Sequence, residues 1–123
     1  MKKILYVEDE PDEVLMIKTR IEDRGYAFIS AADGEDGLKK VCDERPDLVL
    51  LDLILPKMNG YELYAHLKDD PATRDIPVII ITASGAKDLE KQCLALGVQE
   101  IMHKPYDSSY LLKRIAFYLL GEE

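Results

Sequence analysis

The chain has 123 residues, which is the size of one compact domain, so we expect a single domain over residues 1–123 with no separate output domain. Hydrophobic residues make up 47% and charged residues 33%, a composition that supports a folded core and excludes a disordered chain. The 24 acidic and 16 basic residues give a net charge of −8, which argues against electrostatic binding to nucleic acids or to an anionic membrane. No apolar stretch approaches the roughly 20 residues of a membrane helix, so we expect a soluble, cytoplasmic protein.

Short apolar runs alternate with amphipathic stretches along the chain. The apolar runs predict five strands, at residues 3–8, 27–31, 48–51, 78–81 and 100–104. Helical spacing of hydrophobic residues predicts five helices: from 11 to before 25, around 38–45, around 63–67 before a break at 69–71, around 89–96, and over 108–120. Strands that alternate with helices imply an α/β fold, a doubly wound five-stranded parallel sheet with helices on both faces.

Polar residues stand at the carboxyl ends of four predicted strands, where open parallel sheets bind ligands. These residues are, in chain order, Glu8, Asp9, Asp52, Thr82 and Lys104. Three carboxylates packed together repel one another and favour a hard cation such as Mg²⁺, since no histidine or cysteine ligand stands with them. Lys104 and Thr82 add an ammonium and a hydroxyl that can hold phosphoryl oxygens. The set is typical of phosphoryl transfer to a carboxylate nucleophile.

These residues and their neighbours resemble the receiver domain of bacterial two-component response regulators. The resemblance spans essentially the whole chain and rests on Glu8-Asp9, Asp52 before Pro56-Lys57-Met58-Asn59-Gly60, Thr82-Ala83, and Lys104-Pro105-Tyr106. It implies the flavodoxin-like (βα)5 receiver fold and a cis peptide bond between Lys104 and Pro105. It also implies a phosphoacceptor rather than a turnover enzyme, with a sensor histidine kinase or histidine phosphotransfer protein as the phosphoryl donor.

The resemblance assigns a role to each acid. Asp52 matches the aspartate that receives the phosphoryl group from a phosphohistidine. Glu8, Asp9 and Asp52 match the acidic pocket that holds Mg²⁺, and the backbone carbonyl of Ile54 matches a further metal ligand.

Thr82 matches the hydroxyl that contacts the phosphoryl group, and Lys104 matches the ammonium that pairs with it. The sequence departs from the family at Ile101, where a Tyr or Phe ring usually changes position on activation. We therefore expect the signal to rest on Thr82 and on backbone shifts. Ile54 and Ser84 occupy the two positions that influence the lifetime of the phosphoryl group in the family.

Three other functions are alternatives. A flavodoxin needs a phosphate loop rich in Ser, Thr and Gly after its first strand, where this chain has the acidic segment 8–10 and Pro11. A phosphohydrolase of the haloacid dehalogenase type needs a second aspartate two residues after its nucleophile, where Ile54 stands. A receiver that serves only for protein contacts would not need the complete set of acids, Thr82 and Lys104.

The last predicted helix suggests a docking surface. Its two opposite stripes are a core stripe of Leu112, Ile115, Ala116 and Leu119 and an outward stripe of Tyr110, Lys113, Arg114 and Phe117. Aromatic residues and arginine are enriched at protein interfaces. Receivers use the face of their helix 4, strand 5 and helix 5 for partners. We therefore expect a downstream protein or a second copy of this chain there, with no direct binding to nucleic acid and no membrane insertion.

We expect no functional role for the histidines and cysteines, and predict only whether each is exposed or buried. His66 is expected on the solvated side of its helix, and His103 is expected to be packed or partly buried. Cys42 and Cys93 form no CxxC pair, so neither a zinc site nor a disulfide scaffold is indicated. Both lie on apolar stripes and are expected to be small core residues.

Overall fold

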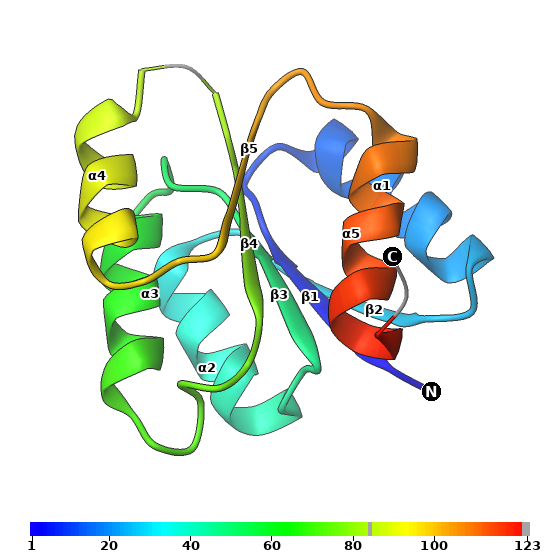
Figure 1. The fold of residues 1–123 in the computed structure, drawn as a ribbon, viewed down its shortest axis with the longest axis horizontal. Coiled ribbons are helices and arrows are strands. Elements are labelled where there is room, and N and C mark those ends of the chain that lie inside the picture. Colours follow the sequence, from blue (N-terminus) through cyan, green and yellow to red (C-terminus); the bar gives the residue numbers. More distant parts are fainter. Residues whose placement is uncertain (84, 122–123) are drawn as a thin grey trace.

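The computed structural model describes residues 1–83 and 85–121 (Figure 1). Its strands are β1 (Lys3–Val7), β2 (Ala27–Ala31), β3 (Leu48–Leu51), β4 (Val78–Thr82) and β5 (Glu100–His103). Its helices are α1 (Pro11–Asp23), α2 (Gly34–Glu44), α3 (Gly60–Asp69), α4 (Lys87–Ala95) and α5 (Ser108–Leu120). The strands form one parallel sheet in the order β2-β1-β3-β4-β5, which confirms the predicted architecture. None of the helices in this described part has the length and apolar character needed to cross a membrane.

Helices α2, α3 and α4 cover one face of the sheet, and α1 and α5 cover the other (Figure 1). Alternate residues of each strand enter the two cores, because successive side chains of a strand point to opposite faces. In β1, Leu5 and Val7 join the core beneath α2 to α4, whereas Ile4 and Tyr6 join the core beneath α1 and α5. Strands β3 and β4 are buried at every residue, which explains their continuous apolar sequences.

The predicted strand bounds differ from the observed ones by at most one residue. Strand β1 ends before Glu8 and β5 ends before Lys104, and β4 extends one residue further than predicted, to Thr82. The predicted bounds of α5 are the observed ones. The polar residues of interest therefore stand at, or one residue beyond, the carboxyl ends of their strands.

Two of the four predictions for histidines and cysteines are wrong. Cys42 is exposed, because the neighbouring Val41 takes the core position of α2. His103 is also exposed, and its Nε2 lies 2.7 Å from the Glu90 carboxylate of α4, because β5 is the edge strand of the sheet. Cys93 is buried and His66 is exposed, as predicted.

The predicted stripes of α5 need correction. The helix buries Leu111 together with Leu112 and Ile115, which rotates its core side away from the predicted stripe, and leaves Ala116 and Leu119 half-buried. Arg114 and Phe117 do not project freely from the outward side. The Arg114 Nε donates to the Glu100 carboxylate at 2.9 Å, and its guanidinium lies 4.5 Å from the centre of the Phe117 ring. Tyr110 and Lys113 remain exposed.

Gly60 allows the loop after β3 to pass directly beneath the start of α3. A Cβ atom at this position would meet the Asp52 carbonyl oxygen and lie 2.6 Å from the Leu53 Cα. The Gly60 N–H donates to the Leu53 carbonyl at 2.9 Å, and the Asn59 side chain caps the helix. This close approach fixes the backbone that carries Asp52.

We predict that Gly60→Ala lowers the free energy of unfolding by about 2–3 kcal/mol, because the added methyl group meets backbone atoms that cannot move aside. The better helix propensity of alanine, about 1 kcal/mol, offsets only part of this loss. Gly37→Ala is the control, since its Cβ would meet side-chain methyl groups of Val7 and Leu63 at 3.0–3.1 Å, which can shift. Equal losses for the two variants in urea unfolding would contradict this explanation.

Candidate functional site

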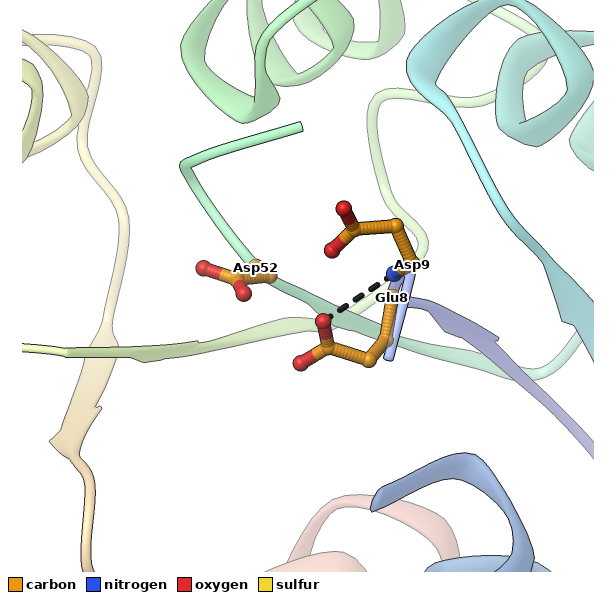
Figure 2. Close-up of side chains that lie close together, drawn as sticks. All are labelled: Glu8, Asp9 and Asp52. Atoms are coloured by element: carbon orange, nitrogen blue, oxygen red, sulfur yellow. Dashed lines mark hydrogen bonds between the residues drawn. The ribbon is translucent and has the colours of Figure 1, made fainter. Parts of the chain in front are cut away.

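Three acids lie together at the carboxyl edge of the sheet (Figure 2). Glu8 and Asp9 follow β1, and Asp52 follows β3, which is the neighbouring strand. Each offers a carboxylate oxygen, and these oxygens lie within 4.8 Å of one another. Glu8 and Asp52 are buried, with exposed fractions of 2% and 6%, whereas Asp9 is exposed. The group can hold a metal ion, and its oxygen-only ligands fit a hard cation.

Glu8 is the most enclosed acid of the group. Its Oε2 accepts hydrogen bonds from the backbone N–H groups of Asp9 at 3.0 Å and Glu10 at 3.2 Å. Its Oε1 accepts from the Tyr6 hydroxyl at 3.3 Å and from Lys104 at 2.5 Å. Burial raises the pKa of Glu8 to about 7, and the Lys104 ammonium opposes that rise. These four hydrogen-bond donors stabilise the buried Glu8 carboxylate, because a buried charge without partners would be costly in free energy.

The Lys104 ammonium binds three acids that precede it in the sequence by 52 to 96 residues. Its Nζ lies 2.5 Å from Glu8 Oε1, 3.1 Å from Asp52 Oδ2 and 3.1 Å from Glu13 Oε2. Burial lowers the pKa of Lys104, but the hydrogen bonds to these acids outweigh it and leave the pKa above its ordinary value. The bond from Lys104 to Pro105 is cis, as the resemblance implies.

Glu13 also lies in this site, and neither it nor Tyr6, which donates to Glu8, was predicted from the sequence. Glu13 lies in the first turn of α1, where an acid is most simply explained by the helix dipole. One signal for it was available, because Glu13 is four residues before the buried Ile17 and therefore on the same side of the helix. Its reach to Lys104 depends on how α1 packs against the segment after β5, which the sequence does not reveal.

The other residues singled out from the sequence are Thr82, Ile54, Ile101 and Ser84. Thr82 is fully buried, and its hydroxyl makes no hydrogen bond within residues 1–83 and 85–121. The Ile54 N–H donates to Asp52 Oδ1 at 3.2 Å, and the Ile54 side chain is 54% exposed. Ile101 is half-buried against the core beneath α2 to α4. Ser84 lies outside the described residues.

Residues 4–116 match the response regulator receiver domain family. The chain belongs to this family. It is 34% identical over 121 residues to the protein PilH of Pseudomonas aeruginosa, covering 98% of this chain and all of PilH. It is 38% identical to PhoB, the phosphate regulon transcriptional regulatory protein of the same organism, covering 93% of this chain and half of PhoB. The chemotaxis response regulator CheY4 of Vibrio cholerae superposes with a TM-score of 0.87 at 27% identity, covering 97% of this chain and 99% of CheY4.

Membership of this family settles the fold and the general class of function. The chain is a receiver domain with the flavodoxin-like fold of CheY, and receiver domains are phosphoacceptors of two-component signalling. They bind Mg²⁺ at an acidic pocket and interact with histidine kinases or phosphotransfer proteins and with downstream targets. The flavodoxin and haloacid dehalogenase alternatives are thereby excluded.

We predict that Thr82→Val keeps or slightly raises the stability of the unphosphorylated protein, because its buried hydroxyl has no partner to lose. Thr73→Val is the matched control, since the buried Thr73 hydroxyl donates to the Leu67 carbonyl at 2.7 Å. That variant should lose about 1 kcal/mol in urea unfolding. Equal losses in the free energy of unfolding for both variants would show that the Thr82 hydroxyl makes a stabilising hydrogen bond in the unphosphorylated protein.

Proposed function

We propose that Asp52 of this receiver accepts a phosphoryl group from a phosphohistidine of a sensor kinase or a phosphotransfer protein. The observation that carries the proposal is the Lys104 ammonium 3.1 Å from Asp52 Oδ2, in the pocket that also holds Glu8 and Asp9. A nucleophilic carboxylate must meet an anionic phosphoryl group, and a cation at this distance offsets their repulsion. Family membership supports the same assignment.

In the proposed reaction, an oxygen of Asp52 forms a bond to phosphorus while the phosphorus–nitrogen bond of the phosphohistidine breaks. The imidazole leaves with the bonding electron pair and takes up a proton. Lys104 pairs with the transferred group, and the buried Thr82 hydroxyl donates to one of its oxygens. The chain acts as a phosphoacceptor that assists its own phosphorylation and dephosphorylation, not as a turnover enzyme on external substrates.

We assign the metal site to Glu8, Asp9, Asp52 and the backbone carbonyl of Ile54. The close carboxylate oxygens of the three acids and the proximity of the Ile54 backbone to Asp52 support this set. When bound, Mg²⁺ supplies the positive charge that lets these acids and an incoming phosphate share one pocket.

We further propose that the domain over residues 1–123 signals through phosphorylation-dependent contacts of its own with a downstream protein. The match to PilH along the whole length of that relative supports this output. The face of α4, β5 and α5 is the proposed docking surface for that protein or for a second copy, and Tyr110 and Lys113 of the predicted outward stripe are exposed on α5. A cytoplasmic location remains a prediction from the sequence.

We expect incubation with acetyl phosphate and Mg²⁺ to add the mass of one phosphoryl group to the protein, measured by intact mass spectrometry. Asp52→Asn should abolish the gain, because the amide lacks the nucleophilic oxygen anion, and EDTA should abolish it in the unchanged chain. Asp75→Asn, which changes an exposed aspartate outside the pocket, should leave the gain unaffected. A gain that persists in Asp52→Asn or in EDTA would refute the assignment.

Two further variants should separate the metal from the ammonium. Asp9→Ala should weaken Mg²⁺ binding, measured by calorimetry, because it removes one carboxylate ligand. Lys104→Ala should leave Mg²⁺ affinity unchanged or raise it, since a like charge is lost, yet slow phosphorylation by roughly 10²-fold. A Lys104→Ala variant that is phosphorylated at the original rate would remove Lys104 from the reaction.

A further inference from the structure

All three donors of the Lys104 ammonium are in use. A lysine ammonium carries three N–H donors and no acceptor, and Lys104 directs them at Glu8, Asp52 and Glu13. Glu8 and Asp52 belong to the site that the receiver resemblance predicts, whereas Glu13 on α1 does not. A phosphoryl group on Asp52 can therefore accept a hydrogen bond from Lys104 only if one of these three acids gives up its own.

The three hydrogen bonds differ in how easily they can be given up. Phosphorylation turns the Asp52 carboxylate into a neutral acyl group that carries an anionic phosphoryl group, so the Lys104 donor that Asp52 held can pass to the phosphoryl group. Glu8 is 2% exposed, so water cannot replace Lys104 as a hydrogen-bond donor to its carboxylate. The Glu13 side chain is 32% exposed, and water can solvate its carboxylate. The donor held by Glu13 is therefore the next one available to a phosphoryl group.

Tyr106 has a hydroxyl that can donate a second hydrogen bond in the region of Glu13. The Tyr106 hydroxyl is buried and makes no hydrogen bond to any residue that the structure describes. The Tyr106 ring packs in the core beneath α1 and α5, where Val14, the neighbour of Glu13, also packs. Burial raises the pKa of Tyr106 to about 12, and the Glu13 carboxylate adds to that rise more than any other charge. Tyr106 is therefore a neutral hydroxyl donor within electrostatic reach of Glu13.

We propose that Glu13 is a positioning residue that competes with the phosphoryl group for Lys104 and passes to the Tyr106 hydroxyl when Lys104 leaves it. This inference rests on the proposed phosphorylation of Asp52. It predicts that Glu13 disfavours the phosphorylated state by holding Lys104. It also predicts that the loss of the Glu13–Lys104 hydrogen bond transmits phosphorylation at the site to α1. Such a route needs no aromatic ring at position 101, where this chain has Ile101.

The competition is tested with Mg²⁺ and beryllofluoride, a noncovalent mimic of the phosphoryl group, by measuring the dissociation constant of beryllofluoride at saturating Mg²⁺. Glu13→Gln should bind beryllofluoride about three- to fivefold more tightly than the unchanged chain, because Lys104 is released from a partly exposed carboxylate. Glu13→Asp keeps the charge but is shorter, and it should show the same gain. Asp12→Asn removes a charge from an exposed residue of the same helical turn and should change the affinity less than twofold.

Two further measurements distinguish a positioning role from a structural one. Without Mg²⁺ and beryllofluoride, the ammonium protons of Lys104 should exchange with water faster in Glu13→Gln and Glu13→Asp than in Asp12→Asn, as observed by NMR. Tyr106→Phe should weaken beryllofluoride binding about twofold in the unchanged chain and have no effect in the Glu13→Gln background.

The outcomes separate this inference from the function on which it rests. If the unchanged chain binds beryllofluoride but Glu13→Gln and Glu13→Asp bind it no more tightly, Glu13 does not compete for Lys104 and the inference is overturned. If Glu13→Gln and Asp12→Asn strengthen binding equally while Glu13→Asp does not, the effect is long-range charge alone and the inference is again overturned. If the unchanged chain binds no beryllofluoride at any Mg²⁺ concentration, the proposed function fails and the inference fails with it.

Discussion

The Lys104 ammonium is the interaction on which the site depends. It joins acids that follow β1 and β3 to an acid on α1, across sequence separations of 52 to 96 residues. Glu8 and Asp52 are buried, and two carboxylates in a largely enclosed edge of the sheet would repel each other without a counter-charge. One ammonium lowers that cost while the pocket remains open on the side of the exposed Asp9. A phosphoryl group bound at this site therefore competes with the carboxylates for the positive charge of Lys104.

The register of the sheet places the groups that Lys104 brings together. Val7 pairs with Leu51, so the residues that follow them, Glu8 and Asp52, emerge side by side. Thr82 pairs with His103, so Lys104 follows at the same edge. The close approach of Gly60 to the Asp52 carbonyl then holds Asp52 against the start of α3. Each of these constraints acts on the backbone, and the side chains meet because the strands are parallel.

The fold and most of the site could be predicted because they depend on local patterns. Continuous apolar runs located the buried strands, and parallel strands oblige the polar residues at their ends to share one edge. The partner of Lys104 on α1 could not be predicted in this way. Glu13 reaches Lys104 only because of the rotation and tilt with which α1 packs, and these are set by contacts among distant side chains.

Rotation about a helix axis and position in the sheet also explain the wrong predictions. Cys42 and Val41 are adjacent on the apolar side of α2, and packing selects Val41 for the core. On α5, the burial of Leu111 changes which residues face outward, and Arg114 pairs with Glu100 of the neighbouring strand. His103 was expected to be packed, but the order of strands, which local sequence does not give, leaves β5 at the edge. Periodicity finds the buried side of an element without fixing its exact rotation.

Asp52, held beside Lys104, is the residue that we propose carries the phosphoryl group. Borohydride reduction of the phosphorylated protein tests this proposal most directly, because it converts an aspartyl phosphate into homoserine that tandem mass spectrometry can locate in the sequence. We expect homoserine at position 52 alone, and only in protein treated with both Mg²⁺ and a phosphoryl donor. Homoserine at another aspartate, or a phosphorylated protein without any homoserine, would contradict this proposal.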